Sequence, residues 1–247
     1  EPFSSVEQGI PTVVVAAIFQ KEPQVLLAHP DQGLETIEDL AKLPTIFMGK
    51  DGYASYFQWM KSTFPGFRDE QYKPYTFNPA PFIADKQSAQ QGYVTSEPFE
   101  IEQQAGWKPK EFLLADYGFD TYSTLIETQS KLVEENPDLV QRFVDASVIG
   151  WYNYLYGDNT AANAAITADN PEMTDAQIAF SIEAMKSRGI VVSGEAETKG
   201  IGCMTAERHK SFFDKMVKAG VIKADLDYKK AFTLAFVCKG VGLDLAK

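Results

Sequence analysis

The sequence contains little cysteine and histidine, and this limits the chemistry it can perform. Its 247 residues include only the cysteines Cys203 and Cys238 and the histidines His29 and His209. The cysteines form no C-x-x-C motif and lie far from His29, so a zinc site or a Cys–His nucleophile has little support. One disulfide and two buried free thiols fit the sequence equally well. We therefore expect no metal site.

Long hydrophobic runs and an excess of basic residues are also missing. The longest apolar stretch, Thr12–Phe19, is far shorter than the roughly 20 residues that span a bilayer. There are 23 basic residues against 34 acidic ones, which gives a formal net charge of −11. Nucleic acids and anionic membrane surfaces are bound by clustered Lys and Arg, so we expect neither as a partner. The G-x-S-x-G motif of many hydrolases does not occur.

The first half of the chain alternates strand-like and helix-like segments. Thr12–Phe19 is continuously apolar and rich in β-branched residues, as in a strand buried on both faces. Further strands are predicted at 24–28, 44–48, 71–77, 93–95 and 112–115, and helices at 53–63, 80–90 and 97–104. This alternation predicts an α/β fold with mostly parallel sheets flanked by helices.

Beyond about residue 128 the pattern becomes helical. Asn136-Pro137 supplies a cap followed by proline in the first turn, and apolar residues then recur at helical spacing. The predicted buried face consists of Val140, Phe143, Val144, Ser147, Trp151 and Leu155. Thr174 to Gln177 fits a capping box before another helix. A last helix is predicted at 205–219, and residues 231–237 fit either a strand or a packed helix.

Loops between these elements carry residues suited to ligand binding, because ligands in open α/β sheets lie beyond the carboxyl ends of strands. At 49–53, Gly52 would allow close backbone approach and Tyr53 could stack, although a plain glycine turn also fits. At 95–98, Ser96 would cap the next helix. Glu97 would accept hydrogen bonds from a ligand with amino donors, or only complement the helix dipole.

A third loop, 116–122, is aromatic and hinge-like around Gly118. Its candidate ligand-binding residues are Asp116, Tyr117 and Tyr122. Either tyrosine could stack on a planar ligand, and either could equally pack in the core. Two-lobed binding proteins close about a few such residues at the ends of elements.

Several segments share a resemblance to one family. They are 9–20 (GIPTVVVAAIFQ), 23–27 (PQVLL), 91–99 (QGYVTSEPF), 116–126 and 134–143. Together they resemble the substrate-binding proteins of ABC importers, in the branch that carries thiamine pyrimidine precursors, taurine, alkanesulfonates and nitrate. The resemblance implies a two-lobed, type II periplasmic-binding-protein-like fold with a hinge between the lobes. Lobe one would comprise residues 1–39 and 114–247, incomplete at the N-terminus because the family's usual first part is missing, and lobe two residues 40–113.

The resemblance also implies a function. A small-molecule solute would bind in a cleft between the lobes and pass to a membrane permease, without catalysis and without a cofactor. The full set of expected ligand-binding residues is Gln20, Gly52, Tyr53, Tyr93, Ser96, Glu97, Asp116, Tyr117 and Tyr122. The expected location is the periplasm, or the outer surface of a Gram-positive cell through a membrane anchor.

The candidate loops favour a planar nitrogenous solute such as a thiamine pyrimidine precursor. They are aromatic and acidic and contain no arginine, whereas a sulfonate or nitrate would prefer arginine or bare helix N-termini. Taurine, sulfonate or nitrate binding remains the alternative. A pyrimidine-synthase-like enzyme shares the fold by resemblance, but it uses a Cys-rich iron motif that this sequence lacks. A sensor built on the same lobes is a further possibility.

Overall fold

The computed structural model describes residues 2–246 and divides into two compact units. Unit 1 comprises Glu1–Glu22, Thr121–Phe213 and Ala224–Lys247, and unit 2 comprises Pro23–Asp120 and Asp214–Lys223. The chain therefore passes from one unit to the other four times. The predicted lobe two comprised residues 40–113. Unit 2 contains these residues and also 23–39, 114–120 and 214–223.

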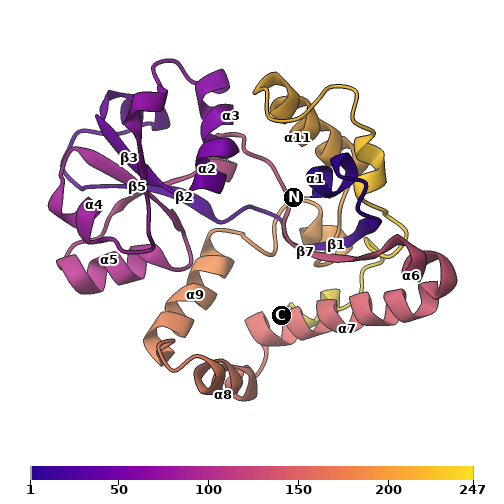
Figure 1. Ribbon diagram of the computed structural model, residues 1–247. Coiled ribbons are helices and arrows are strands. Elements are labelled where there is room, and N and C mark those ends of the chain that lie inside the picture. The colour runs from indigo at the N-terminus through magenta and orange to yellow at the C-terminus, as the bar shows by residue number, and fades with distance from the viewer. Residues whose placement is uncertain (1, 247) are drawn as a thin grey trace. The chain divides into compact units, whose positions relative to one another are not determined.

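Unit 2 is built on a five-stranded sheet of order β4-β3-β5-β2-β6 (Figure 1). Its strands are β2 (Gln24–Ala28), β3 (Thr45–Met48), β4 (Tyr72–Pro74), β5 (Ser88–Tyr93) and β6 (Lys110–Leu113). β3 pairs in parallel with β4 and β5, while β2 runs antiparallel to both β5 and β6. All strands except β2 thus point the same way, as the mostly parallel prediction requires.

Strand β5 corrects the predicted helix at 80–90. The helix α4 (Ala80–Ala84) is short, and the strand begins at Ser88. The composition of 88–91, Ser-Ala-Gln-Gln, suits a helix in isolation. Within the fold, Ala89 is fully buried and is paired with Ala28 on one side and with Ile46 on the other. Tertiary pairing therefore overrides local propensity at this point.

Helices cover both faces of the sheet of unit 2, α2 and α3 on one face and α4 and α5 on the other (Figure 1). The α-helices besides α4 are α2 (Lys50–Ala54), α3 (Tyr56–Thr63) and α5 (Glu97–Ala105). Short 3-10 helices are η1 (Ile37–Lys42), η2 (Asp69–Gln71) and η3 (Leu114–Tyr117). The single helix predicted at 53–63 is interrupted at Ser55, which caps α2 and precedes α3. The core between the layers contains Leu26, Leu27, Ile46, Phe57, Phe82 and Phe112.

Unit 1 is organised around the predicted apolar strand β1 (Thr12–Phe19). It pairs antiparallel with β7 (Ser123–Gln129), which brings Thr12 opposite Gln129. Its other edge is held by two isolated contacts. The Thr233 N–H donates to the Val14 carbonyl at 2.9 Å, and the Ala17 N–H donates to the Gly202 carbonyl at 3.1 Å. Because its centre is fully buried, β1 forms the core of this unit.

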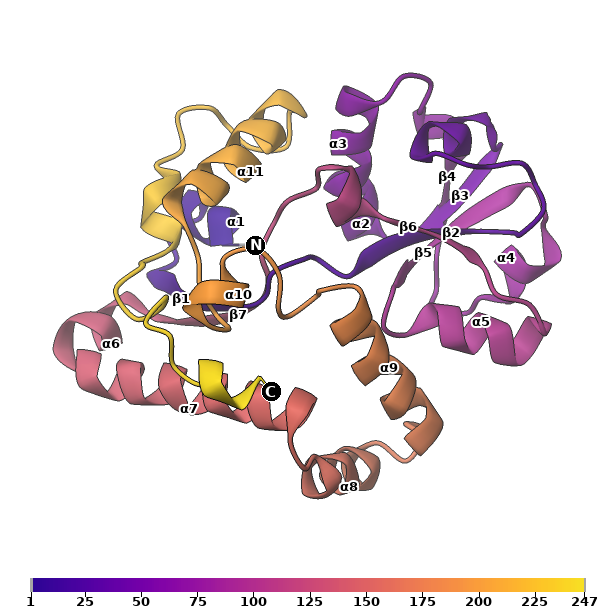
Figure 2. The ribbon, with the colours of Figure 1, turned by 180° about the vertical axis from the view of Figure 1, so that it is seen from behind.

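The remaining helices are α1 (Pro2–Glu7), α6 (Ser130–Glu135), α7 (Pro137–Tyr156), α8 (Thr160–Asp169), α9 (Asp175–Ser187), α10 (Ala196–Lys199), α11 (Ala206–Lys218), η4 (Tyr228–Ala231) and η5 (Leu243–Leu245). Helices α1, α6 and α7 lie beside the strand pair, whereas α8 and α9 continue from the end of α7 and lie away from it (Figure 2). Helix α11 begins in unit 1, and its residues from Asp214 onward belong to unit 2. The predicted caps are confirmed, since Asn136 Oδ1 accepts from the Leu139 N–H and Thr174 Oγ1 accepts from the Gln177 N–H. Residues 231–237 form neither a strand nor a helix after η4 ends.

The buried face of α7 agrees with the prediction at Val140, Val144 and Leu155 only, since Ser147 and Trp151 are half-buried. Its buried residues are Val140, Val144, Val148, Tyr152 and Leu155. Phe143, predicted to be buried, is 61% exposed. The buried side chains recur at intervals of four or three residues from Val140, and Phe143 lies beside this stripe rather than on it.

A disulfide joins Cys203 to Cys238 in unit 1. This decides between the two alternatives that the sequence left open. The bridge ties the segment that precedes α11 to the irregular C-terminal segment. The Cys203 carbonyl also accepts a 2.9 Å hydrogen bond from Gln20 Nε2, so the bridged segment supports the residue that follows β1.

Removal of the disulfide is expected to destabilise unit 1. The bridge spans 35 residues, and the loss of a cross-link of that span costs about 4 kcal/mol in the chain-entropy model. The variant Cys203→Ala/Cys238→Ala should therefore unfold at clearly lower urea concentration than the oxidised wild type. Wild type measured in reductant is the matched control and should approach the variant. Equal midpoints for oxidised and reduced wild type would contradict this prediction.

Candidate functional site

The carboxyl ends of β3, β4, β5 and β6 meet at one edge of the sheet of unit 2, because these strands point the same way. The residues that follow them form the segments 49–53, 75–78, 93–97 and 114–118. Ligands of open α/β sheets bind at this kind of edge. Most of the predicted site residues of the central unit lie here, so this edge is the candidate site.

Gln91 connects the first segment to the sheet. Its Oε1 accepts hydrogen bonds from the Gly49 N–H at 2.7 Å and from the Tyr56 hydroxyl at 3.0 Å. Tyr56 is almost fully buried, and burial raises the pKa of its hydroxyl far above the ordinary value. The phenol therefore stays protonated and acts as a donor. This network fixes the start of α2 and α3 against β5.

Gly52 has a packing role in this network. A Cβ at position 52 would lie 2.6 Å from the ring and hydroxyl of Tyr56, closer than any side chain can tolerate. The absence of a side chain therefore makes room for Tyr56. Close approach of a ligand to Gly52 stays a prediction.

Tyr53 is anchored by neighbours in its own unit. Its hydroxyl donates to Asp69 Oδ1 at 3.0 Å, and Asp69 also pairs with Lys61 at 2.6 Å. The hydrogen bond to Asp69 is the main reason that the pKa of Tyr53 is raised. The ring lies 4.5 Å from that of Tyr72, centroid to centroid. Within the fold the ring of Tyr53 contacts those of Tyr72 and Phe57, and stacking of Tyr53 on a ligand stays a prediction.

Glu97 folds back over the end of β5. Its Oε2 accepts the Tyr93 N–H at 2.7 Å, and Gly92 leaves space for its side chain. Burial raises the pKa of the Glu97 carboxyl above its ordinary value. Ser96 occupies the predicted N-cap position of α5, but the side-chain cap is not formed. Its side chain makes no capping hydrogen bond and is exposed, since the turn is closed by the Ser96 N–H donating to the Tyr93 carbonyl.

Two aromatic residues that the sequence analysis did not select lie after β4. Tyr75 is buried, and its pKa is raised by burial first and then by the nearby carboxylates Glu97 and Glu100. Phe77 follows with its ring centroid 5.4 Å from that of Tyr75, and it is 78% exposed. A possible sequence signal is the alternation Tyr75, Phe77 before the turn residues Asn78-Pro79.

The segment after β6 holds Asp116 and Tyr117 in η3, which ends at Gly118 with a φ of 102°. Asp116 is exposed and Tyr117 half-buried, and burial raises the pKa of Tyr117. The segment is secured by Lys215, which donates to the Gly118 carbonyl at 2.9 Å and pairs with Asp120 at 2.6 Å. The part of the predicted hinge-like loop up to Asp120 is thus held in unit 2, Thr121 and Tyr122 belong to unit 1, and a hinge role stays a prediction.

Gln20 and Tyr122, the remaining predicted residues, lie in unit 1. Gln20 is fully buried. Its Nε2 donates to the carbonyls of Ala17 and Cys203, and its Oε1 is buried without a hydrogen-bond partner among the described residues. Tyr122 is 6% exposed, its hydroxyl accepts the Thr205 N–H at 3.0 Å, and the Arg208 guanidinium lies 4.1 Å from the centre of its ring. Its role in the fold is therefore packing, and ligand stacking stays a prediction.

Arg208 also binds both segments that leave unit 1. Its Nη2 donates to the Gln20 carbonyl and, at 3.4 Å, to the Thr121 carbonyl. Its Nη1 lies 3.8 Å from Glu195 Oε2. One guanidinium therefore fixes the chain just before its first passage into unit 2 and just after its return.

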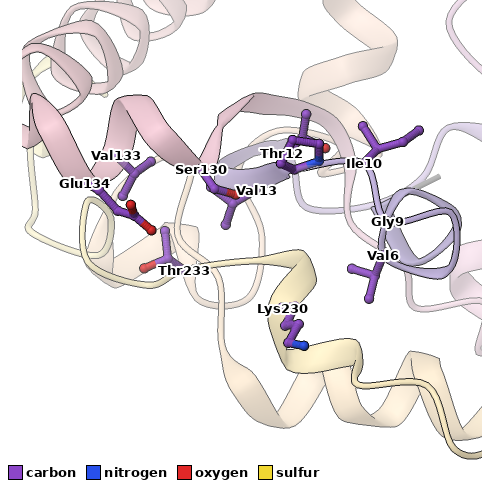
Figure 3. Close-up of a pocket in the computed structure, with 11 residues that line it drawn as sticks. Val6, Gly9, Ile10, Thr12, Val13, Ser130, Val133, Glu134, Lys230 and Thr233 are labelled. Atoms are coloured by element: carbon purple, nitrogen blue, oxygen red, sulfur yellow. The ribbon is translucent and has the colours of Figure 1, made fainter.

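Two pockets lie away from the predicted residues. A pocket of about 440 Å³ in unit 1 is bounded by the start of β1, by α6 and by the segment around Lys230 (Figure 3). A pocket of about 290 Å³ in unit 2 is lined by 29–35 and 108–110, at the opposite end of the sheet from the candidate site. Neither contains a predicted site residue.

Among residues 2–246 there is no group of three or more His, Cys, Asp or Glu side chains that could hold a metal ion. No helix in the described part of the chain has both the length and the apolar character to cross a bilayer.

Solved structures of solute-binding proteins share this architecture. One is a ligand-binding component of an ABC-type import system from Staphylococcus aureus with zinc bound (TM-score 0.62, 12% identity, 98% of this chain and 78% of that one). Another is the alkanesulfonate-binding protein SsuA from Xanthomonas axonopodis pv. citri bound to MOPS (TM-score 0.59, 13% identity, 94% and 77%). The desulfurization enzyme DSZB is also similar (TM-score 0.55, 14% identity, 96% and 82%). The predicted periplasmic-binding-protein-like fold is confirmed.

The chain belongs to the NMT1/THI5-like family, whose model matches residues 3–162. The family resemblance predicted from the sequence is therefore confirmed. A relative, the riboflavin-binding protein RibY from Chloroflexus aurantiacus, is 25% identical over 240 residues. The match covers 95% of this chain and 67% of RibY.

The packing of Tyr56 against Gly52 predicts the effect of a single methyl group. Gly52→Ala would force the Tyr56 ring to move and break its hydrogen bond to Gln91, at a cost of about 1–3 kcal/mol. Chemical denaturation would measure this loss. Gly150→Ala is the matched control, because position 150 is a helical glycine with nothing within 4 Å of the added Cβ. That control should be neutral or slightly stabilising. A fully stable Gly52→Ala would disprove the packing role.

The environment of His209 predicts acid sensitivity of unit 1. His209 stacks on Phe232 at 3.8 Å, contacts Tyr122 and neighbours Arg208, which is itself near Glu195. Burial first, and Arg208 second, lower the pKa of His209 to about 4. The folded state resists protonation of His209, whereas the unfolded state takes up the proton near pH 6.5. The contribution of neutral His209 to stability is therefore complete above about pH 6.5 and is lost as the pH falls toward 4.

At pH 5 this loss amounts to about 1–2 kcal/mol. Urea unfolding of wild type and His209→Gln between pH 7.5 and 4.5 would isolate the effect of the imidazole. The variant should show a flatter profile over this range. Parallel profiles for the two proteins would contradict the assignment.

Proposed function

We propose that the chain is the solute-binding component of an ABC importer, that it captures a planar nitrogenous small molecule, and that it presents this molecule to a membrane permease. A thiamine pyrimidine precursor or a related heterocycle is the proposed solute. The observation that carries the proposal is family membership together with the aromatic and acidic character of the candidate edge in unit 2. Closure of the lobes about a hinge stays a prediction.

The residues at the candidate edge support the ligand class. Tyr93 is half-exposed, Phe77 is largely exposed, and the Glu97 carboxylate accepts the Tyr93 N–H and lies near the Tyr75 hydroxyl. Aromatic faces suit flat rings, and a carboxylate accepts hydrogen bonds from ring amino or imide groups. The relative RibY is named as a riboflavin-binding protein, and riboflavin is itself a planar nitrogen heterocycle.

The disulfide supports a location outside the cytoplasm. Disulfides such as Cys203–Cys238 form and persist in oxidising compartments, including the periplasm and the cell surface. A periplasmic protein, or one anchored outside a Gram-positive cell, is therefore the proposed setting. A permease partner follows from this setting and from the proposed transport role.

Sulfonate binding is the second candidate function, favoured by the fold shared with SsuA. The candidate edge argues against it, because the Gly49 N–H, a donor that an anion could use, already binds Gln91. An enzyme is the third candidate, since DSZB has a similar fold. Binding is preferred because Cys203 and Cys238 are joined to each other and neither provides a nucleophilic thiol.

Thermal shift and calorimetric titration with a small solute panel would test the proposal. The panel consists of a hydroxymethyl aminopyrimidine, riboflavin, taurine, an alkanesulfonate and nitrate, with ribose as a control without an aromatic ring. A true ligand at 100 times its Kd should stabilise the protein by about 2.7 kcal/mol. Stabilisation by a planar heterocycle is the expected result. Stabilisation only by taurine, sulfonate or nitrate, or chemical conversion of a heterocycle, would refute the proposal.

A further inference from the structure

Phe77 is an unusual residue in unit 2. Its side chain is 78% exposed, and its φ is +59°, a conformation that bulky side chains rarely adopt. Exposed aromatic area and a left-handed backbone both lower stability, and the Phe77 ring lies 5.4 Å from that of Tyr75, centroid to centroid. Such features persist where the surroundings impose them and concentrate at ligand-binding positions.

The segment that carries Phe77 is held firmly at both ends. The Tyr75 N–H before it donates to the Met48 carbonyl at 3.0 Å, which extends the pairing of β4 with β3. After it, Asn78 Oδ1 accepts the Ala80 N–H at 3.0 Å and leads into α4. The aromatic ring is therefore presented by a defined turn rather than by a loose loop.

The ring lies in a continuous group of polar and aromatic side chains. Phe77 contacts Tyr75, and Glu97 lies close enough to Tyr75 to influence its hydroxyl. Glu97 in turn binds the backbone of Tyr93, which is 50% exposed at the end of β5. One N–H from Tyr93 uses only part of the acceptor capacity of a carboxylate, which can accept about four hydrogen bonds.

We propose that Phe77 is a stacking residue of the solute site, and that it holds a planar heterocycle whose ring N–H or amino groups donate to Glu97. This inference rests on the proposed function and adds a residue that determines which solutes the site binds. Flat aromatic ligands with hydrogen-bond donors fit this combination. Simple alkanesulfonates and nitrate do not, because they lack both a ring face and donors for the carboxylate, and taurine has an ammonium donor but no ring face.

Four variants at one position separate stacking from simple apolar contact. Phe77→Ala removes the ring, Phe77→Leu retains apolar area without a flat face, and Phe77→Tyr and Phe77→Trp restore a face. Phe143→Ala is the matched control, since Phe143 is also largely exposed but lies on α7 in unit 1. Because Phe77 is exposed, all variants should keep the melting temperature of the unliganded protein.

Calorimetric titration with riboflavin and with the hydroxymethyl aminopyrimidine gives the readout. For whichever heterocycle the wild type binds, Phe77→Ala and Phe77→Leu should each raise Kd about tenfold. Phe77→Tyr and Phe77→Trp should restore affinity, Phe143→Ala should leave it unchanged, and Glu97→Gln should weaken it. Fluorescence of Phe77→Trp should be quenched when riboflavin binds.

The outcomes distinguish the inference from the proposed function. If the wild type binds a heterocycle and Phe77→Ala binds it equally well, the inference is wrong while the proposed function stands. If Phe77→Leu binds as well as wild type, Phe77 provides apolar contact and stacking is disproved. If the wild type binds only taurine, sulfonate or nitrate, or no solute at all, the proposed class of planar heterocyclic ligands and the inference are both wrong.

Discussion

Strand β2 is hydrogen-bonded along both edges, and the arrangement of unit 2 depends on it. It lies between β5 and β6, so that Val25 is opposite Gly92 on one side and Leu113 on the other. All five of its residues are buried, and Gln24 Nε2 donates to the Gly92 carbonyl at 3.0 Å. Just before the strand, the Pro23 carbonyl accepts the Val94 N–H. The entry of the chain into unit 2 is thereby fastened to the segment that carries Tyr93 and Glu97.

Much of the fold could be predicted because hydrophobic pattern and capping chemistry act locally. The apolar run of β1, the Asn136 cap and the Thr174 cap all correspond to observed elements. The pattern failed where tertiary contacts decide. Residues 88–90 have helical composition, yet they pair between two strands. The antiparallel direction of β2 could not be read from its own five residues, because it is set by neighbours far along the chain.

The candidate site was predictable in its position but less so in its chemistry. The rule that ligands lie beyond the carboxyl ends of strands located the segments around Gly52 and Glu97. It could not show that Gly52 accommodates Tyr56, because that contact depends on how α3 packs. Phe77 was missed for a related reason. It ends the segment predicted as a strand at 71–77, and its high exposure and left-handed backbone depend on how that segment folds.

The pairing of β1 with β7 also dictates an order of events during synthesis. Thr12 can pair only after Gln129 has been synthesised. All five strands of the sheet of unit 2 lie in the continuous stretch Pro23–Asp120, which is synthesised between β1 and β7. The central sheet can therefore close while β1 is still unpaired. Until its partner emerges, the run Val-Val-Val-Ala-Ala-Ile is an open, aggregation-prone strand. Unit 1 is completed last, and its disulfide can form only after a further long stretch of chain has followed β7.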